Sequence, residues 1–288
     1  MRKPLWIMFL SIALITMACG INFNLPVTEV KTGPTQTDEI NIPIPESAPP
    51  IDLDLSFGAG KIKINSGAEN SLLSGKAIYN VSDFKPEIEI EGRKVTIKQG
   101  NLNIKGFPNF EDKIENEWDF QLGKTPVNLK ISAGAYSGQY ELGGLSIQNL
   151  EIMDGASDVN LEFSEPNLVD MDTFRYNTGA SNVTLEGLGN ANFATMIFRS
   201  GAGSYKIDFS GEMRRDAVVS IESGISSMTI VVPAGVPVNL TYEGGLSNID
   251  IFGAWKKSSD AVYTQDGTGA KLTILIKMSA GSLELRNR

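Results

Sequence analysis

A repeat of about 22 residues fills most of the second half of this 288-residue chain and limits what the chain can fold into. Each copy has two runs of alternating apolar and polar residues, one on either side of a glycine. The clearest copies centre on Gly155, Gly179, Gly201, Gly224 and Gly245, at spacings of 24, 22, 23 and 21 residues. Related copies centre on Gly58, Gly134 and Ser279. A fixed period of this length indicates stacked supersecondary units.

The apolar positions are the same in every copy. Around Gly179, the residues Phe174, Tyr176, Val183 and Leu185 are apolar, whereas the residues between them are mostly polar. Alternation with period two on both sides of a glycine predicts two short strands per copy with one face inward. Because the same positions face inward in each copy, we expect an all-β fold, a β-solenoid of about seven to eight coils. The glycine is expected at a corner that requires positive φ or close backbone approach.

Small polar residues follow the corner glycine in most copies, as in Ser157-Asp158 and Ser181-Asn182. Such a column could form a ladder that binds a ligand. It could equally satisfy the backbone of the turn and hydrogen-bond along the stack. We favour the second interpretation.

The N-terminus indicates export. Arg2 and Lys3 precede an apolar run from Leu5 to Ala18, which is shorter than the roughly 20 residues that cross a bilayer and has the dimensions of a signal peptide. The only cysteine, Cys19, follows directly, and the segment resembles a bacterial lipoprotein signal in which Cys19 is acylated and becomes the mature N-terminus. A plain secretory signal with an unrelated cysteine is the alternative. The expected location is the bacterial cell envelope, with the protein anchored to a membrane and facing away from the cytoplasm.

Four regions follow from these patterns. Residues 1–18 are the signal peptide. Residues 19–50 hold six of the thirteen prolines and are expected to be a disordered linker. Residues 51–130 form a less regular β region, in which Glu87–Gln99 alternates across Gly92 and predicts a hairpin, and residues 131–288 form the repetitive solenoid. Gly253–Gly269 is expected to be a loop inserted into one coil.

The composition excludes several classes of function. The chain has no histidine, so a catalytic triad with a histidine base and a histidine-ligated zinc site are excluded. One cysteine excludes an intramolecular disulfide. The net charge of −9 argues against a nucleic-acid partner. Because no nucleophile elbow or phosphate-cradling loop is present either, we expect no cofactor and no enzymatic activity.

Two groups of residues could nevertheless bind a ligand. Glu162, Glu186 and Asp208 share one outward column in successive copies. They could hold a cation, or form a solvated acidic face with Lys206 as counter-charge, which we favour. In the loop, Trp255, Lys256 and Lys257 could form a binding surface, since an exposed indole stacks on sugars. Trp118 is expected in the core.

The stretch SFGAGKIKINSGAENSLLSGKAIYNV (Ser56–Val81), the motif NEWDFQL (Asn116–Leu122) and the glycine repeats resemble the toast-rack domain family of bacterial envelope proteins. They are also similar to β-solenoids proposed as adhesins and to the cell-wall-active antibiotic response family. The resemblance implies a β fold and no specific chemistry, because the toast-rack family has no established activity. One branch of the antibiotic-response relatives regulates a histidine kinase of envelope stress.

These observations lead to three hypotheses. The first is a non-enzymatic, lipid-anchored protein that presents an adhesin-like binding or scaffold surface to a glycan or an envelope protein. The second is a regulator that contacts a membrane sensor kinase. The third, which we do not favour, is a polysaccharide-active enzyme that depends on Glu186 or Asp208. Self-association is also open, because the last copy of the repeat ends at Leu285, close to the C-terminus.

Overall fold

The computed structural model describes residues 27–29, 32–100, 107–109 and 113–287. The chain divides into two compact units. In the smaller unit, which comprises Met1–Lys31 and Leu102–Lys113, strand β1 (Val27–Glu29) pairs in parallel with β7 (Phe107–Asn109). The larger unit, Thr32–Asn101 with Ile114–Arg288, contains all other described elements. Cys19 and the expected signal peptide lie outside the described residues.

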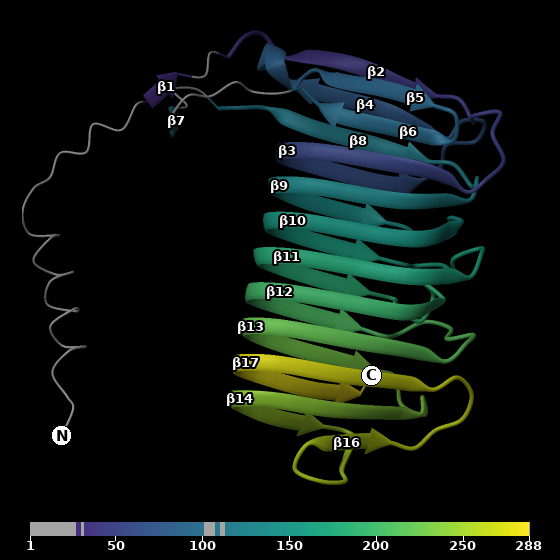
Figure 1. Ribbon diagram of the computed structural model, residues 1–288, viewed down its shortest axis with the longest axis vertical. Coiled ribbons are helices and arrows are strands. Elements are labelled where there is room, and N and C mark those ends of the chain that lie inside the picture. The colour runs from purple at the N-terminus through teal and green to yellow at the C-terminus, as the bar shows by residue number, and fades with distance from the viewer. Residues whose placement is uncertain (1–26, 30–31, 101–106, 110–112, 288) are drawn as a thin grey trace, which may run out of the picture. The chain divides into compact units, whose positions relative to one another are not determined.

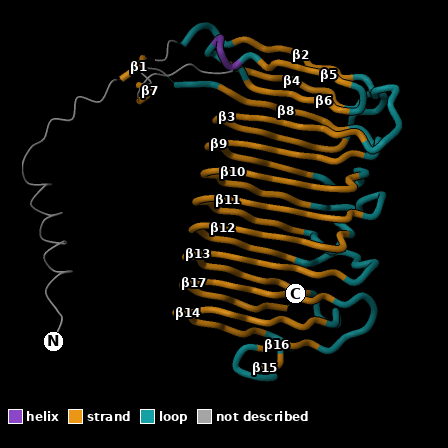
Figure 2. Tube along the Cα trace, in the orientation of Figure 1, coloured by secondary structure: helices purple, strands orange, loops and turns teal. Residues whose placement is uncertain are grey.

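The larger unit is a stack of long parallel strands (Figure 1). Its long strands have 15 or 16 residues each: β3 (Ile51–Ser66), β9 (Val127–Glu141), β10 (Ile147–Glu162), β11 (Met171–Glu186), β12 (Phe193–Asp208), β13 (Ala217–Val232), β14 (Val238–Phe252) and β17 (Leu272–Asn287). Each strand bends at its corner, so its first half lies in one layer and its second half in the other. The loops that connect successive strands gather along the opposite side of the stack (Figure 2).

The apolar columns of the repeat build the core between the two layers. Leu150, Phe174 and Met196 are neighbours in register on successive strands, and each is at most 1% exposed. Val183 and Leu185, on the other side of the corner, are equally buried. The predicted all-β, solenoid-like stack is therefore confirmed, with the same columns facing inward in each coil.

The corner glycine does not interrupt the strand, in contrast to the expected pair of short strands. A Cβ on Gly179 would lie 2.3 Å from the carbonyl oxygen of Gly155 in the preceding coil, and a Cβ on Gly201 would lie 2.7 Å from that of Gly179. At these two corners glycine is favoured because the backbones approach closely there, and not because of positive φ. Positive φ occurs two residues later in some coils, as at Gly203 (φ 152°).

The N-terminal end of the stack is closed by shorter strands. β5 (Pro86–Glu91) and β6 (Lys94–Gln99) form the antiparallel hairpin that the alternation across Gly92 predicts, and β6 pairs with the first half of β3. Beyond the second half of β3 lie β8 (Asn116–Leu122), β4 (Leu73–Tyr79) and β2 (Gln36–Ile42). The short 3₁₀ helix η1 (Ser82–Phe84) follows β4.

Strand β2 corrects the expected linker boundary. Residues 36–42 fall within the segment 19–50 that the proline content assigns to a disordered linker, yet they pair along their length with β4. Ile40 and Ile42 alternate with polar residues and are 5% and 2% exposed, so the strand buries enough apolar surface to be ordered. The six prolines of the segment lie on either side of this strand, from Pro26 and Pro34 before it to Pro43 directly after it.

The C-terminal end differs from the simple order of the repeat. The last strand, β17, lies between β13 and β14, so the final copy of the repeat is an internal coil. The outermost long strand is β14, whose first half pairs with β16 (Val262–Gln265), and β16 pairs with β15 (Lys256–Lys257). Leu285 therefore does not lie in the last coil of the stack, as the sequence order suggested, and self-association stays a prediction. Among the described residues, no helix is long and apolar enough to cross a membrane.

Candidate binding surface

The outward side chains of the first half of each long strand form one continuous surface, here called the first face. It consists of three columns in which neighbours are in register: one from Asp52 to Asn239, one from Asp54 to Thr241 and one from Ser56 to Glu243. These positions point outward because they alternate with the buried apolar columns. Two hollows lie on this face.

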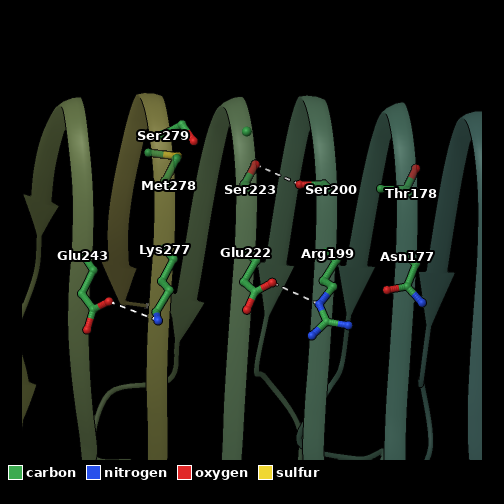
Figure 3. Close-up of a pocket in the computed structure, with 11 residues that line it drawn as sticks. Asn177, Thr178, Arg199, Ser200, Glu222, Ser223, Glu243, Lys277, Met278 and Ser279 are labelled. Atoms are coloured by element: carbon green, nitrogen blue, oxygen red, sulfur yellow. Dashed lines mark hydrogen bonds and ion pairs between the residues drawn. The ribbon is translucent and has the colours of Figure 1, made fainter.

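The first hollow, near the corner, has a volume of about 610 Å³ and is called the corner hollow (Figure 3). Its charges alternate in sign from strand to strand. Arg199 Nε lies 3.1 Å from Glu222 Oε2, and Lys277 Nζ lies 3.3 Å from Glu243 Oε2. Each of these four charged groups therefore has a partner of opposite sign on a neighbouring strand.

The second hollow has a volume of about 630 Å³ and is called the amide hollow. Strands β6, β3, β9, β10 and β11 line it. A ladder of hydrogen bonds crosses it toward Asp52: Asn149 Nδ2 donates to Asn128 Oδ1 at 2.9 Å, and Asn128 Nδ2 donates to Asp52 Oδ1 at 2.7 Å. The other carboxylate oxygen of Asp52 accepts a bond from Arg93 Nε at 2.9 Å.

A second column in the amide hollow carries charges. Lys94 Nζ lies 3.3 Å from Asp54 Oδ2, and Lys130 Nζ lies 3.5 Å from Glu151 Oε2. Arg175 follows Glu151 in register on β11 and is half-buried. With the residues that the structure describes, the guanidinium of Arg175 forms neither an ion pair within 4.0 Å nor a hydrogen bond.

A smaller hollow, of about 420 Å³, lies on the outward side of the second halves of the long strands, near the N-terminal end of the stack. It is lined by Lys61, Lys63 and Lys76 together with Glu117 and Asp119. Lys61 Nζ lies 2.7 Å from Glu117 Oε1, and this hydrogen bond raises the pKa of Lys61 above its ordinary value. Carboxylates are interleaved with the lysines in this hollow.

The polar residues at the corner serve the corner itself. Ser157 Oγ donates to Ser181 Oγ at 2.9 Å, and Ser223 Oγ donates to Ser226 Oγ at 2.8 Å. Asp154 accepts a hydrogen bond from Tyr176 at 2.9 Å, and burial followed by the Asp154 charge raises the pKa of this tyrosine well above its ordinary value. The favoured interpretation of the serine column, satisfied turns rather than a binding ladder, agrees with these contacts.

The acidic column is not arranged as a cation site. Glu162 and Glu186 are neighbours in register, but Glu186 Oε1 lies 2.5 Å from Lys206 Nζ, which is the expected counter-charge. Asp208 is 1% exposed, and its Oδ1 accepts a bond from the backbone N–H of Ser210 at 2.8 Å. Asp208 is therefore buried at the end of β12, where it accepts a bond from the turn that follows, in contrast to the expected solvated face. In the described ranges no three acidic, histidine or cysteine residues gather as metal ligands.

The loop residues are placed differently from the expected surface. Trp255 is 7% exposed and belongs to the core, where it fills the end of the stack, so it offers no open ring for stacking. Lys256 and Lys257 are exposed, but they pair with Asp266 and Asp260 of the same loop. Trp118 is 1% exposed, as expected of a core residue.

The amide hollow was missed by the sequence-based expectations. Asn128, Asn149 and Arg175 appear in the repeat only as polar residues between apolar ones. Their outward direction follows from the alternation, and that signal could have grouped them. Whether Arg175 finds an ion-pair partner depends on how the side chains are placed, and the sequence pattern carries no information on that.

Comparison with solved structures finds several matches over most of the chain. A proposed cell adhesion protein from Clostridium sporogenes is 19% identical, with a TM-score of 0.48, covering 88% of this chain and 100% of that one. A proposed lipid-binding protein from Parabacteroides distasonis is 10% identical, with a TM-score of 0.40, covering 90% and 99%. A proposed adhesin from Parabacteroides merdae is 11% identical, with a TM-score of 0.36, covering 90% and 98%. Identities and scores this low do not indicate what this chain binds.

No curated protein matches the chain. A family model does: the N-terminal domain of toast_rack, DUF2154, matches residues 31–186. The match includes β2, the N-terminal closing strands and the first coils, and thus more than half of the chain. Together with the stacked fold, this match shows that the chain belongs to the toast-rack family.

Proposed function

We propose that this protein is a non-enzymatic, lipid-anchored protein of the bacterial envelope that presents its first face as an adhesin-like binding surface. The observation that carries the proposal is the first face itself: polar side chains in register over successive strands, with two hollows of about 610 and 630 Å³. Hollows of this size suit small-molecule and saccharide ligands. The buried core beneath fixes the spacing of the side chains that line them.

The sequence supports the location. The signal-like N-terminus ends at Cys19, where acylation would attach the chain to a membrane. Each carboxylate that lines the two hollows is in an ion pair or a hydrogen-bond ladder, and none is grouped with a second one as a general acid and base, which favours binding over catalysis.

In-cell photo-crosslinking of the full-length protein tests this proposal. Probes at Thr195 and Thr273, outward on the first face, are compared with probes at Thr184 and Thr229 on the outer side of the second halves. We expect envelope glycan or a cell-surface ligand to be captured from the first face only. Reproducible capture of a membrane sensor kinase, or equal capture from both sides, would contradict the proposal. A Cys19→Ser variant controls for the anchor, since it should leave the membrane fraction.

A further inference from the structure

The two hollows of the first face differ in their charge balance. In the corner hollow, the two cations and the two anions that line it pair with one another. In the amide hollow, Lys94 and Lys130 pair with Asp54 and Glu151, and Asp52 is bound by Arg93. Arg175 is left as a cation without an ion pair among the described residues. The amide hollow therefore offers an anionic ligand a binding group that the corner hollow lacks.

The surroundings of Arg175 suit a ligand with hydroxyl groups. Thr173 lies two residues away on the same face of β11, roughly 7 Å along the strand. Asn149 on β10 is the neighbour of Thr173 in register, and its Nδ2 donates to Asn128. Its carbonyl oxygen Oδ1 accepts no hydrogen bond from the described residues and can accept one from a ligand. Ile197, the neighbour of Arg175 on β12, is partly exposed and gives an apolar contact on the other side.

We propose that the amide hollow binds an acidic sugar of a polysaccharide, with the sugar carboxylate on Arg175 and its hydroxyls on Thr173 and Asn149. The proposal rests on the proposed function and names its ligand class. The planar guanidinium matches a carboxylate through two parallel hydrogen bonds. The flanking amide and hydroxyl groups match sugar hydroxyls, and Ile197 matches the apolar face of a ring.

The net charge of the chain indicates that an acidic glycan would bind at a local site and not through general electrostatic attraction to the protein. At −9, the protein repels polyanions as a whole, so an acidic glycan is retained only where a local cation and fitting hydrogen-bond partners outweigh that repulsion. Binding is therefore expected to depend on one arginine, and not on the total number of basic residues.

Calorimetric titration of the full-length protein in detergent tests the assignment. The probes are oligogalacturonate and its methyl ester, which keeps the hydroxyls but removes the charge. Arg175→Gln is compared with Arg214→Gln, a matched control in the loop between β12 and β13, outside the first face, whose guanidinium is paired with Glu212. We expect Arg175→Gln and methyl esterification each to weaken binding roughly tenfold or more, as expected for loss of a charged hydrogen bond. Arg214→Gln should stay within about twofold of wild type.

Several results would overturn the inference. Equal affinity of wild type and Arg175→Gln, with both variants folded by circular dichroism, would exclude Arg175 as the anchor. Equal binding of polyglutamate and oligogalacturonate would refute the sugar class. Failure to bind oligogalacturonate, combined with capture of another glycan from Thr195 or Thr273, would overturn this inference and leave the proposed function standing.

Discussion

At the residue scale, the column of corner glycines sets how closely the coils stack. The α-carbons of Gly155, Gly179 and Gly201 face the carbonyl oxygens of the preceding coil with no room for a Cβ at a normal distance. An added methyl group must either push the coils apart or shift the corner. The polar ladders on both outer surfaces depend on the same spacing, so the corner links the packing of the backbone to the geometry of the hollows.

We therefore expect Gly179→Ala to be destabilising. Its Cβ would lie 2.3 Å from the carbonyl oxygen of Gly155, and overpacking of this kind costs about 1–3 kcal/mol. Urea unfolding followed by circular dichroism measures the change. The control is Ala180→Ser, at the exposed neighbouring position, which should stay within about 0.5 kcal/mol of wild type. Equal stability of Gly179→Ala and Ala180→Ser would contradict the close approach.

Tyr79 gives an expected dependence of stability on pH. Its hydroxyl donates to Asp38 Oδ2 at 2.9 Å, and burial followed by this hydrogen bond raises the pKa of Tyr79 to about 12. In the unfolded chain the pKa is about 10, so the folded state holds the proton more tightly. The stability that this provides is complete below pH 10 and is lost as the pH rises from about 10 to 12.

The free energy of unfolding in urea, measured between pH 8 and 12, checks this. Wild type should lose stability steeply above pH 10. Tyr79→Phe should show a smaller loss of stability over the same pH range. Part of the loss should remain in this variant, because burial also raises the pKa values of Tyr136, Tyr140 and Tyr176. Identical pH profiles for the two proteins would refute the assignment to Tyr79.

At the scale of elements, the two ends of the stack are closed in different ways. The N-terminal end has added strands in both layers, namely β5–β6 and β8–β4–β2. At the C-terminal end, among the strands that the structure describes, only the first half of β14 has a further partner, the β15–β16 hairpin. The loop before this hairpin buries Trp255, and Tyr263 of β16 is 3% exposed. The segment Gly253–Gly269 is therefore a structural cap.

Trp255→Ala is expected to lower the free energy of unfolding by about 3–5 kcal/mol, since it leaves a cavity at the end of the core. The neighbouring Lys256→Ala removes only an exposed ion pair with Asp266 and should cost at most about 1 kcal/mol. Chemical denaturation of both variants makes the comparison. If Trp255→Ala were as stable as Lys256→Ala, the loop would not be a cap.

At the scale of the whole molecule, strand order departs from chain order. β17 separates β13 from β14, although β14 follows β13 in the sequence. The two candidate neighbours of β13 have matching inward residues: Leu240 and Tyr242 in β14 occupy the same columns as Ile274 and Ile276 in β17. The repeat therefore allows either strand beside β13, and only the complete packing decides between them.

Engineered cysteine pairs in a Cys19→Ser background test this order. Glu222 and Lys277 are neighbours in register on β13 and β17, about 4.8 Å apart, so Glu222→Cys with Lys277→Cys should form a disulfide on mild oxidation. Glu222→Cys with Glu243→Cys spans two strand spacings, roughly 10 Å, and should remain reduced. Non-reducing gels distinguish the two forms. A disulfide in the second pair and not in the first would show that β14, and not β17, lies beside β13.

The parts of the fold that the sequence predicts are those with local signals. The apolar columns around Phe174 and Val183 specify the coil, and the alternation across Gly92 specifies the β5–β6 hairpin, because both signals are local. The strand at Ile40 and Ile42 was hidden by the surrounding prolines. The amide hollow depends on the register of β9, β10 and β11 and on which charges find partners, so residue patterns reveal its polar character but not the unpaired Arg175.

The most direct test of the binding surface is a nuclear magnetic resonance titration of the side-chain amides of Asn128 and Asn149 and the Nε–H of Arg175. Oligogalacturonate is added to the labelled full-length protein in detergent. We expect the signals of Asn149 and Arg175 to shift in a saturable way, while those of Lys256, Lys257 and the indole of Trp255 stay in place. Shifts confined to the Gly253–Gly269 cap, or to the outer side of the second halves, would contradict it.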